Sequence, residues 1–212
     1  MMSTITWDDS IRNFIQQAGS ANPTPGGGSV AALTAALGAS MTSMVCNLSQ
    51  GEKFAHIQPQ ITETIEKLSE LTEECEQLLH DDINTFSQYM DALKLPKNTD
   101  EEKAIRKSAM QEATIEAIDV PLRLIELCKT GMLCTTNIAE SSNKNVISDL
   151  GIGAILFEAA AQSASLTVEI NLASLKDLNL KDQYSEKLSS LITEIEELRS
   201  KALIITRNRI LQ

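Results

Sequence analysis

Residues 30–50 read VAALTAALGASMTSMVCNLSQ, a stretch of small and aliphatic residues without a single charge. Its small side chains, among them Ala31, Ala35 and Gly38, recur at helical spacing. Small side chains on a helix allow a second backbone to approach closely. The stretch therefore predicts a helix from about Val30 to Gln50 that lies at the centre of a bundle or along a dimer seam.

A second stretch, from about Leu150 to Leu175, has the same composition, with Gly151, Gly153 and Ala154 near its start. Ser148 and Asp149 precede it and suit the first turn of a helix. It predicts a second tightly packed helix. A bundle that is poor in large side chains is consistent with an aromatic content of only 3%.

The other helices show apolar residues at three-and-four spacing, which predicts amphipathic surfaces. They are expected at about Trp7–Gln17, Pro59–Asp91, Thr99–Lys129 and Gln183–Asn208. Thr99 and Glu102 have the spacing of a capping box, while Pro121 predicts a kink or break near Val120 and Gly131 a helix end. Since no strand pattern is found, residues 1–212 are predicted to form a single all-α domain, a bundle of long antiparallel helices with no sheet.

Charge and cysteine usage narrow the class of protein. The formal net charge of −11 argues against a nucleic-acid partner, because neutralising phosphates requires clustered lysine and arginine. The N-terminus has no basic region followed by an apolar core, and residues 30–48 carry too many polar residues for a confident membrane span. We therefore expect a cytoplasmic protein with no membrane partner. Its four cysteines show no paired spacing, which predicts buried free thiols.

A loop rich in glycine and proline, PTPGGGS over residues 23–29, precedes the first small-residue helix, and Ser29 is the predicted N-cap. Glycines at a helix start can turn backbone N–H groups toward an anionic ligand. The loop lacks the lysine of a phosphate-binding P-loop and follows no strand, so it is not a dinucleotide motif. From the pattern alone, a tight structural turn and a ligand site are equally acceptable.

Three carboxylates are further candidates. Asp81 and Asp82 are adjacent in a helical pattern, so at most one of them faces a pocket, and two solvated aspartates are the simpler reading. Asp149 could serve only to bind first-turn amides. His56 and His80 have no partner at metal-ligand spacing, which predicts that there is no metal site.

Several motifs together resemble a known family. The run PGGGSVAAL at residues 25–33 continues through Met44–Leu48 to Gly51, and is followed by Asp82–Phe86 with Leu95–Lys97. Val120–Leu122, Asn145–Gly153 and Ile170–Leu172 follow in the same order. In these residues the chain resembles the formiminotetrahydrofolate cyclodeaminase and methenyltetrahydrofolate cyclohydrolase family over nearly its whole length.

The resemblance implies a helical bundle that forms a homodimer and acts in folate one-carbon metabolism. Members cyclise 5-formiminotetrahydrofolate to 5,10-methenyltetrahydrofolate with release of ammonia, or hydrolyse the methenyl compound to 10-formyltetrahydrofolate. The resemblance implies no metal and no redox cofactor, only the folate substrate. It does not distinguish the two reactions.

The resemblance also implies roles for individual residues. Asp82 is expected to be the catalytic carboxylate, because both reactions involve an amidine-like carbon with positive charge. The loop residues Gly26, Gly27, Gly28 and Ser29 are expected to contact the folate. Asn145 and Asp149 are expected to orient the pterin, and Lys53 to meet a carboxylate of the folate tail.

The chain departs from the expected family pattern at three places, one of which is the linker Ser141–Asn143, where an expected glycine is missing. Glu52 stands where a basic residue is usual, and Thr167 stands where an asparagine is usual. These departures motivate an alternative interpretation, a non-catalytic helical homologue that binds folate or a partner protein.

Overall fold

The computed structural model describes residues 5–212, and helices account for nearly all of their regular structure. No strand occurs in this part of the chain, so the all-α prediction is confirmed. The elements are α1 (Ile11–Ala18), α2 (Gly27–Asn47), η1 (Glu52–Ile57), α3 (Gln58–Lys94), α4 (Asp100–Ile138), η2 (Lys144–Val146), α5 (Ile147–Leu172) and α6 (Leu178–Leu211).

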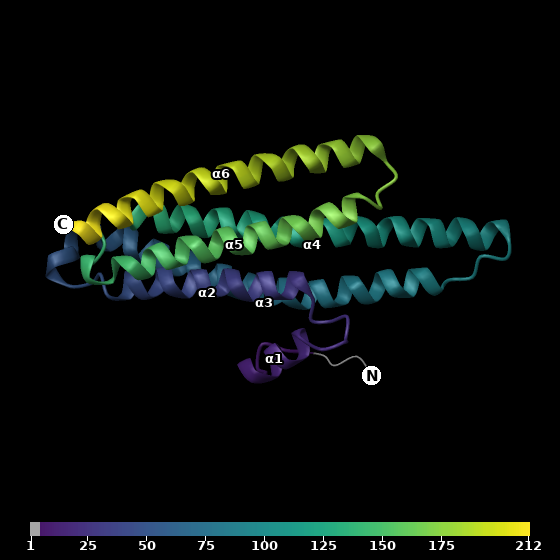
Figure 1. Cartoon of the computed structure of the whole chain (residues 1–212), viewed down its shortest axis with the longest axis horizontal. Coiled ribbons are helices and arrows are strands. Elements are labelled where there is room, and N and C mark those ends of the chain that lie inside the picture. The colour runs from purple at the N-terminus through teal and green to yellow at the C-terminus, as the bar shows by residue number, and fades with distance from the viewer. Residues whose placement is uncertain (1–4) are drawn as a thin grey trace.

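Helices α2 to α6 lie along one long axis, and each runs antiparallel to the helix before it (Figure 1). Helices α2 and α5 pack against each other at the centre, α2 also contacts α3, and α5 also contacts α4 and α6. The α3–α4 hairpin extends beyond the other helices at one end, and the short η1 and η2 segments lie toward the opposite end (Figure 1).

The close approach of α2 and α5 depends on glycine. A Cβ atom on Gly38 would lie 3.2 Å from the carbonyl oxygen of Gly153, and one on Gly153 would lie 2.8 Å from the Thr42 hydroxyl. The largest fully buried side chain, Phe157, fills the space beside Gly131, where an added Cβ would be 2.2 Å from its ring. The prediction of tightly packed central helices is therefore confirmed.

Helix α4 is longer than predicted. It continues through Pro121 and past Gly131 to Ile138, so the expected break near Val120 and the expected end at Gly131 were wrong. Proline has no N–H to donate to the carbonyl four residues earlier. That carbonyl, of Ala117, instead accepts the side-chain amide of Asn171 from α5 at 3.0 Å. Helix α4 thus keeps its hydrogen bonding with the help of a neighbouring helix.

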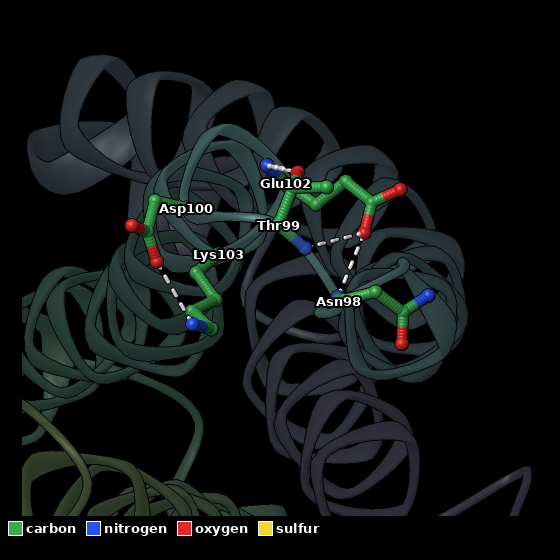
Figure 2. Close-up of polar contacts among 5 residues, drawn as sticks. All are labelled: Asn98, Thr99, Asp100, Glu102 and Lys103. Carbon is green, nitrogen blue, oxygen red and sulfur yellow. Dashed lines mark hydrogen bonds and ion pairs between the residues drawn. The ribbon is translucent and has the colours of Figure 1, made fainter.

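The capping box at the start of α4 is confirmed. The Thr99 hydroxyl accepts the Glu102 backbone N–H at 3.2 Å, and the Glu102 carboxylate accepts the N–H groups of Thr99 and Asn98 at 3.1 and 2.7 Å (Figure 2). Beside it, Lys103 forms an ion pair with Asp100 at 2.9 Å (Figure 2). These bonds satisfy N–H groups at the helix start that have no partner within the helix.

Two helices begin earlier than predicted. Helix α2 starts at Gly27 and its N-cap is Gly26, so the prediction that Ser29 caps this helix was wrong. Helix α5 starts at Ile147, which places Asp149 in its first turn. The four cysteines are buried and free, as predicted.

Candidate functional site

The candidate site lies where the N-terminus of α2 meets the middle of α3. The Asp82 carboxylate on α3 accepts the backbone N–H of Ser29 at 2.9 Å and the Ser29 hydroxyl at 2.7 Å. Ser29 lies in the first turn of α2, where backbone N–H groups lack partners within the helix. A carboxylate from another helix therefore caps α2, and the partial positive charge of the helix N-terminus stabilises its ionised form.

Gly28 makes this contact possible. A Cβ atom on Gly28 would lie 2.1 Å from an oxygen of the Asp82 carboxylate and 2.6 Å from its carbon. Only a residue without a side chain can occupy this position while Asp82 stays in place. By contrast, a Cβ on Gly27 would meet no atom within 4 Å. The neighbouring glycines are thus not equivalent.

Asp82 is chemically distinct from an ordinary surface aspartate. Burial raises the pKa of the Asp82 carboxyl, and the two hydrogen bonds from Ser29 oppose that effect without cancelling it. A carboxyl group with a raised pKa holds a proton closer to neutral pH, as general acid–base chemistry requires. Such perturbed groups are enriched at functional sites.

The adjacent Asp81 has different partners. It accepts the Gln77 side-chain amide at 2.8 Å, and the Arg123 guanidinium lies 3.7 Å from its other oxygen. Neither contact involves α2. The two aspartates therefore serve different surroundings, and Asp82 is the one that meets the glycine loop.

The other predicted site residues lie elsewhere in the chain. Lys53 is exposed in η1, with its ammonium 5.5 Å from the centre of the Phe54 ring. Asn145 is exposed in η2, and Asp149 is half-buried in α5. The loops that carry them meet through Asn143, whose backbone N–H donates to the Ser49 hydroxyl at 2.8 Å.

This second group is far from Asp82 within one chain. Helix α3 starts at Gln58, directly after η1, and at about 1.5 Å rise per residue it travels roughly 36 Å before it reaches Asp82. The structure therefore brings Gly26, Gly27, Gly28 and Ser29 to Asp82, but it leaves Lys53, Asn145 and Asp149 at the opposite end of the bundle. Sequence motifs could not reveal this separation.

Metal-ligating side chains are scattered over the structure. Between residues 5 and 212 no group of three or more histidine, cysteine, aspartate or glutamate side chains is arranged to hold a metal ion. His56 in η1 and His80 on α3 lie on different elements. The absence of a metal and of a redox cofactor remains a prediction.

Comparisons with known proteins agree with the motifs and the fold. The sequence pattern of the family described as "Formiminotransferase-cyclodeaminase" matches residues 10–190, most of the chain. The chain belongs to this family. The resemblance inferred from the glycine loop and the later motifs is thus confirmed.

Two relatives match the chain over different shares of their own length. A methenyltetrahydrofolate cyclohydrolase from Methylorubrum extorquens is 35% identical over 204 residues, which are 96% of this chain and 98% of the relative. A formimidoyltransferase-cyclodeaminase from Mus musculus is also 35% identical, over 88% of this chain but only 35% of its own length. The chain thus matches the whole of one family member and a part of a larger one.

A solved family structure has the same fold. The crystal structure of formiminotetrahydrofolate cyclodeaminase from Thermotoga maritima superposes with a TM-score of 0.86 at 26% sequence identity, and covers 95% of this chain and 97% of the other. Few residues of either chain therefore lack a counterpart in the other. The roles assigned to individual residues remain predictions, which the site geometry makes testable.

Proposed function

We propose that this protein is a folate one-carbon enzyme that cyclises 5-formiminotetrahydrofolate to 5,10-methenyltetrahydrofolate with release of ammonia, hydrolyses 5,10-methenyltetrahydrofolate to 10-formyltetrahydrofolate, or does both. Its relatives are named for these reactions. The observation that carries the proposal is the Asp82 carboxyl, which Ser29 holds against the N-terminus of α2 and which fills the space beside Gly28 where a side chain would otherwise lie.

The proposed chemistry needs a group that moves protons next to a cationic carbon. In the cyclisation, the second folate nitrogen attacks the formimino carbon and loses a proton, while the departing ammonia gains one. In the hydrolysis, water attacks the methenyl carbon and gives up both of its protons. One goes to solvent, and the other goes to the folate nitrogen that is released when its bond to this carbon breaks. Asp82 can accept and return a proton in either case, and its negative charge stabilises the cationic carbon.

The same site suits a folate in other respects. Gly27 is exposed and leaves open space at the start of α2, so a ligand can reach the backbone there without meeting a side chain. The substrate itself carries the reacting carbon, and we propose that neither a metal nor a redox cofactor takes part.

We also propose that the protein works as a homodimer through an apolar surface on α2 and α5, called here the α2/α5 face. Its large exposed side chains are Val30 and Leu37 on α2, Leu48 directly after α2, and Ile152, Ile155, Leu166 and Ile170 on α5. Leu37 and Ile152 directly precede Gly38 and Gly153, two glycines at which α2 and α5 approach each other closely, so the exposed residues of both helices border the same interface. An apolar surface of this extent calls for a partner.

The two helices of this face are also long and apolar enough to span a membrane. Gly27–Asn47 and Lys144–Leu172 have windows with a mean hydropathy of 1.5 and 1.2, of which 56% and 50% is buried inside the bundle. Their buried halves form the core, and a second copy of the chain would cover the rest. We propose this arrangement, in the cytoplasm, in preference to membrane insertion.

A homodimer would also bring the separated site residues together. A twofold axis across the middle of the α2/α5 face, near Leu37, would set the α2 N-terminus of one protomer beside the η1–η2 end of the other. Lys53, Asn145 and Asp149 would then serve the Asp82 site of the second copy. Mixing inactive Asp82→Asn and Lys53→Ala proteins tests this, because mixed dimers would regain one intact site only if the site is shared.

The function is tested by mixing the purified protein with 5,10-methenyltetrahydrofolate and following its near-ultraviolet absorbance, with 5-formiminotetrahydrofolate in a parallel cuvette. Loss of the methenyl signal above the spontaneous rate identifies a cyclohydrolase, and its appearance from the formimino compound identifies a cyclodeaminase. If a folded protein that still binds folate changes the absorbance in neither reaction, the proposal is overturned in favour of the non-catalytic alternative.

A further inference from the structure

A cavity of about 630 Å³ lies at the end of the bundle where the α3–α4 hairpin extends beyond the other helices (Figure 1). Its walls come from Tyr89 on α3, from the link between α3 and α4, from the first turns of α4, and from the link between α5 and α6. Helix α2 begins at Gly27 and α5 ends at Leu172, so neither fills the space along the hairpin tip. Asp82 does not line this cavity.

The cavity is basic although the chain is acidic. Five of its lining residues are cations, namely Lys97, Lys103, Arg106, Lys107 and Lys176, in a protein whose formal net charge is −11. They come from three separate segments of the chain, so no run of basic residues marks them in the sequence. If surface charges were placed at random in so acidic a chain, a cavity lining would more often be negative than positive.

Most of this positive charge lacks a counter-charge. Lys103 is paired with Asp100, but Lys97, Lys107 and Lys176 have no carboxylate within 4.0 Å among residues 5–212. The one acidic lining residue, Asp177, is already engaged as the N-cap of α6, where it accepts the Leu180 N–H at 3.1 Å. Like charges held together without partners repel each other, and a bound anion relieves that repulsion.

Arg106 is held in place and keeps hydrogen-bonding capacity. Its Nε and Nη2 atoms donate to the carbonyl oxygen of Leu93 at the end of α3, at 3.4 and 3.3 Å. The remaining N–H groups of the guanidinium are free to bind a carboxylate or phosphate. Beside these cations the lining has an apolar part, made by buried Leu175 and half-buried Met110 and Tyr89, and a polar part that includes Gln111, Thr114 and Ser174.

The cavity is also aligned with the candidate site. Tyr89 follows Asp82 by two helical turns on the same face of α3, a distance of roughly 10 Å along the helix axis. A ligand part that extends along α3 from Asp82, past the start of α2, therefore reaches the basic lining.

From these observations we infer that the cavity binds a small organic polyanion, a ligand with an apolar body and two or more phosphate or carboxylate groups. Two sources have this chemistry. One is a free phosphorylated metabolite. The other is the carboxylate-bearing tail of a folate whose reacting end lies at Asp82, and this source rests on the proposed function.

Direct binding tests the inference without any need for turnover. Adenosine triphosphate represents the first source, and p-aminobenzoyl-triglutamate, a folate tail without its pterin, represents the second. Each is titrated calorimetrically into the full chain, into a Lys107→Gln, Lys176→Gln double variant, and into a Lys201→Gln, Arg207→Gln control. The control cations are exposed, form no ion pair in residues 5–212, and do not line the cavity.

Binding of at least one probe tighter than about 1 mM is expected, weakened about tenfold by the cavity variant but not by the control. If only the triphosphate binds, the source is a free metabolite, and if only the triglutamate binds, it is the folate tail. If neither binds, or if both variants weaken binding equally, the inference is overturned. An inactive protein that still shows the cavity-dependent binding would refute the proposed function alone.

Discussion

The Asp82 carboxylate and Ser29, 53 positions apart in the sequence, form two hydrogen bonds at 2.9 and 2.7 Å. The bond from the backbone N–H caps the N-terminus of α2, and the bond from the serine hydroxyl goes to the same carboxylate oxygen. The contact therefore has a structural role and a chemical role at once. Variants that change one role and preserve the other can separate them.

Replacement of Gly28 by alanine should displace Asp82, because the new Cβ would lie 2.1 Å from the carboxylate oxygen. We expect a loss of turnover of about a hundredfold, in the range of an impaired general acid–base group. Overpacking should also lower the free energy of unfolding by about 1–3 kcal/mol. Steady-state kinetics and urea denaturation measure the two effects.

The matched control is Gly27→Ala, one residue earlier in the same turn. An added Cβ there meets no protein atom within 4 Å, so stability should change by less than about 1 kcal/mol. Because Gly27 is also proposed to face the ligand, this control applies to stability alone, and an equal loss of stability in both variants would show that the loop needs glycine for flexibility and not for the approach of Asp82.

Replacement of Asp82 by asparagine should abolish most turnover while the protein stays folded, because the amide oxygen can still accept the bonds from Ser29. The stability difference should depend on pH. Burial raises the pKa of Asp82, so the folded protein binds this proton more tightly than the unfolded chain. The corresponding stability is present below the unfolded value of 3.8 and is lost as pH rises through the folded-state pKa.

Asparagine does not titrate, so the variant should become more stable relative to the natural protein as pH rises across that window. Denaturant titrations of both proteins at a series of pH values, from acid to neutral, measure the difference. A difference that does not vary with pH would show that the folded environment leaves the carboxyl unperturbed.

Replacement of Ser29 by alanine removes the hydroxyl bond at 2.7 Å but keeps the backbone N–H bond. The hydroxyl bond lowers the pKa of Asp82, so its loss should raise that pKa further. The acidic limb of the kcat/KM profile should move to higher pH, and the fall in kcat/KM should be largest on that limb.

Ser40→Ala serves as the control for this measurement. Ser40 lies on the same helix, and its hydroxyl donates to the Ala36 carbonyl at 2.9 Å, away from Asp82. Its pH profile should match that of the natural protein. If Ser29→Ala leaves the profile unmoved as well, Asp82 is not the group that titrates in turnover.

Charge placed in the α2/α5 face should separate the proposed homodimer. Leu37 and Ile155 are 50% and 48% exposed in the isolated chain, so Leu37→Glu with Ile155→Glu should fold normally but bury charge in the interface. Sedimentation should show a dimer for the natural protein and a monomer near 23.1 kDa for the variant. Leu211→Glu, at the C-terminus and 85% exposed, should remain dimeric.

Removal of the Asn171 side chain by an alanine substitution should leave the Ala117 carbonyl without its partner from α5. We expect a cost of about 1–3 kcal/mol in the free energy of unfolding. In a Pro121→Ala background the restored backbone N–H can bond this carbonyl, so the cost should be smaller. A double-mutant cycle by urea denaturation measures the coupling, and purely additive effects would contradict this account of the helix.

The sequence alone was sufficient for features that depend on neighbours in the chain. The small residues of Val30–Gln50 predicted a central helix, the Thr99 and Glu102 spacing predicted the capping box, and the lack of alternation excluded strands. These inferences hold because helix periodicity and capping involve residues only three or four positions apart. The glycine-loop motif, together with the later motifs in their order along the chain, also pointed to the family.

Only the tertiary structure decided the features that depend on distant partners. Helix α4 continues through Pro121 because Asn171, 54 positions after Ala117, donates the missing hydrogen bond to the Ala117 carbonyl. Helix α2 starts at Gly27, earlier than predicted, because Asp82 from another helix caps it. The same contact identifies Asp82, and not the adjacent Asp81, as the candidate catalytic carboxylate. Lys53 lies before the start of α3, and α3, which rises about 1.5 Å per residue, travels roughly 36 Å from Gln58 to Asp82, so a long helix carries neighbouring motifs to opposite ends of the bundle.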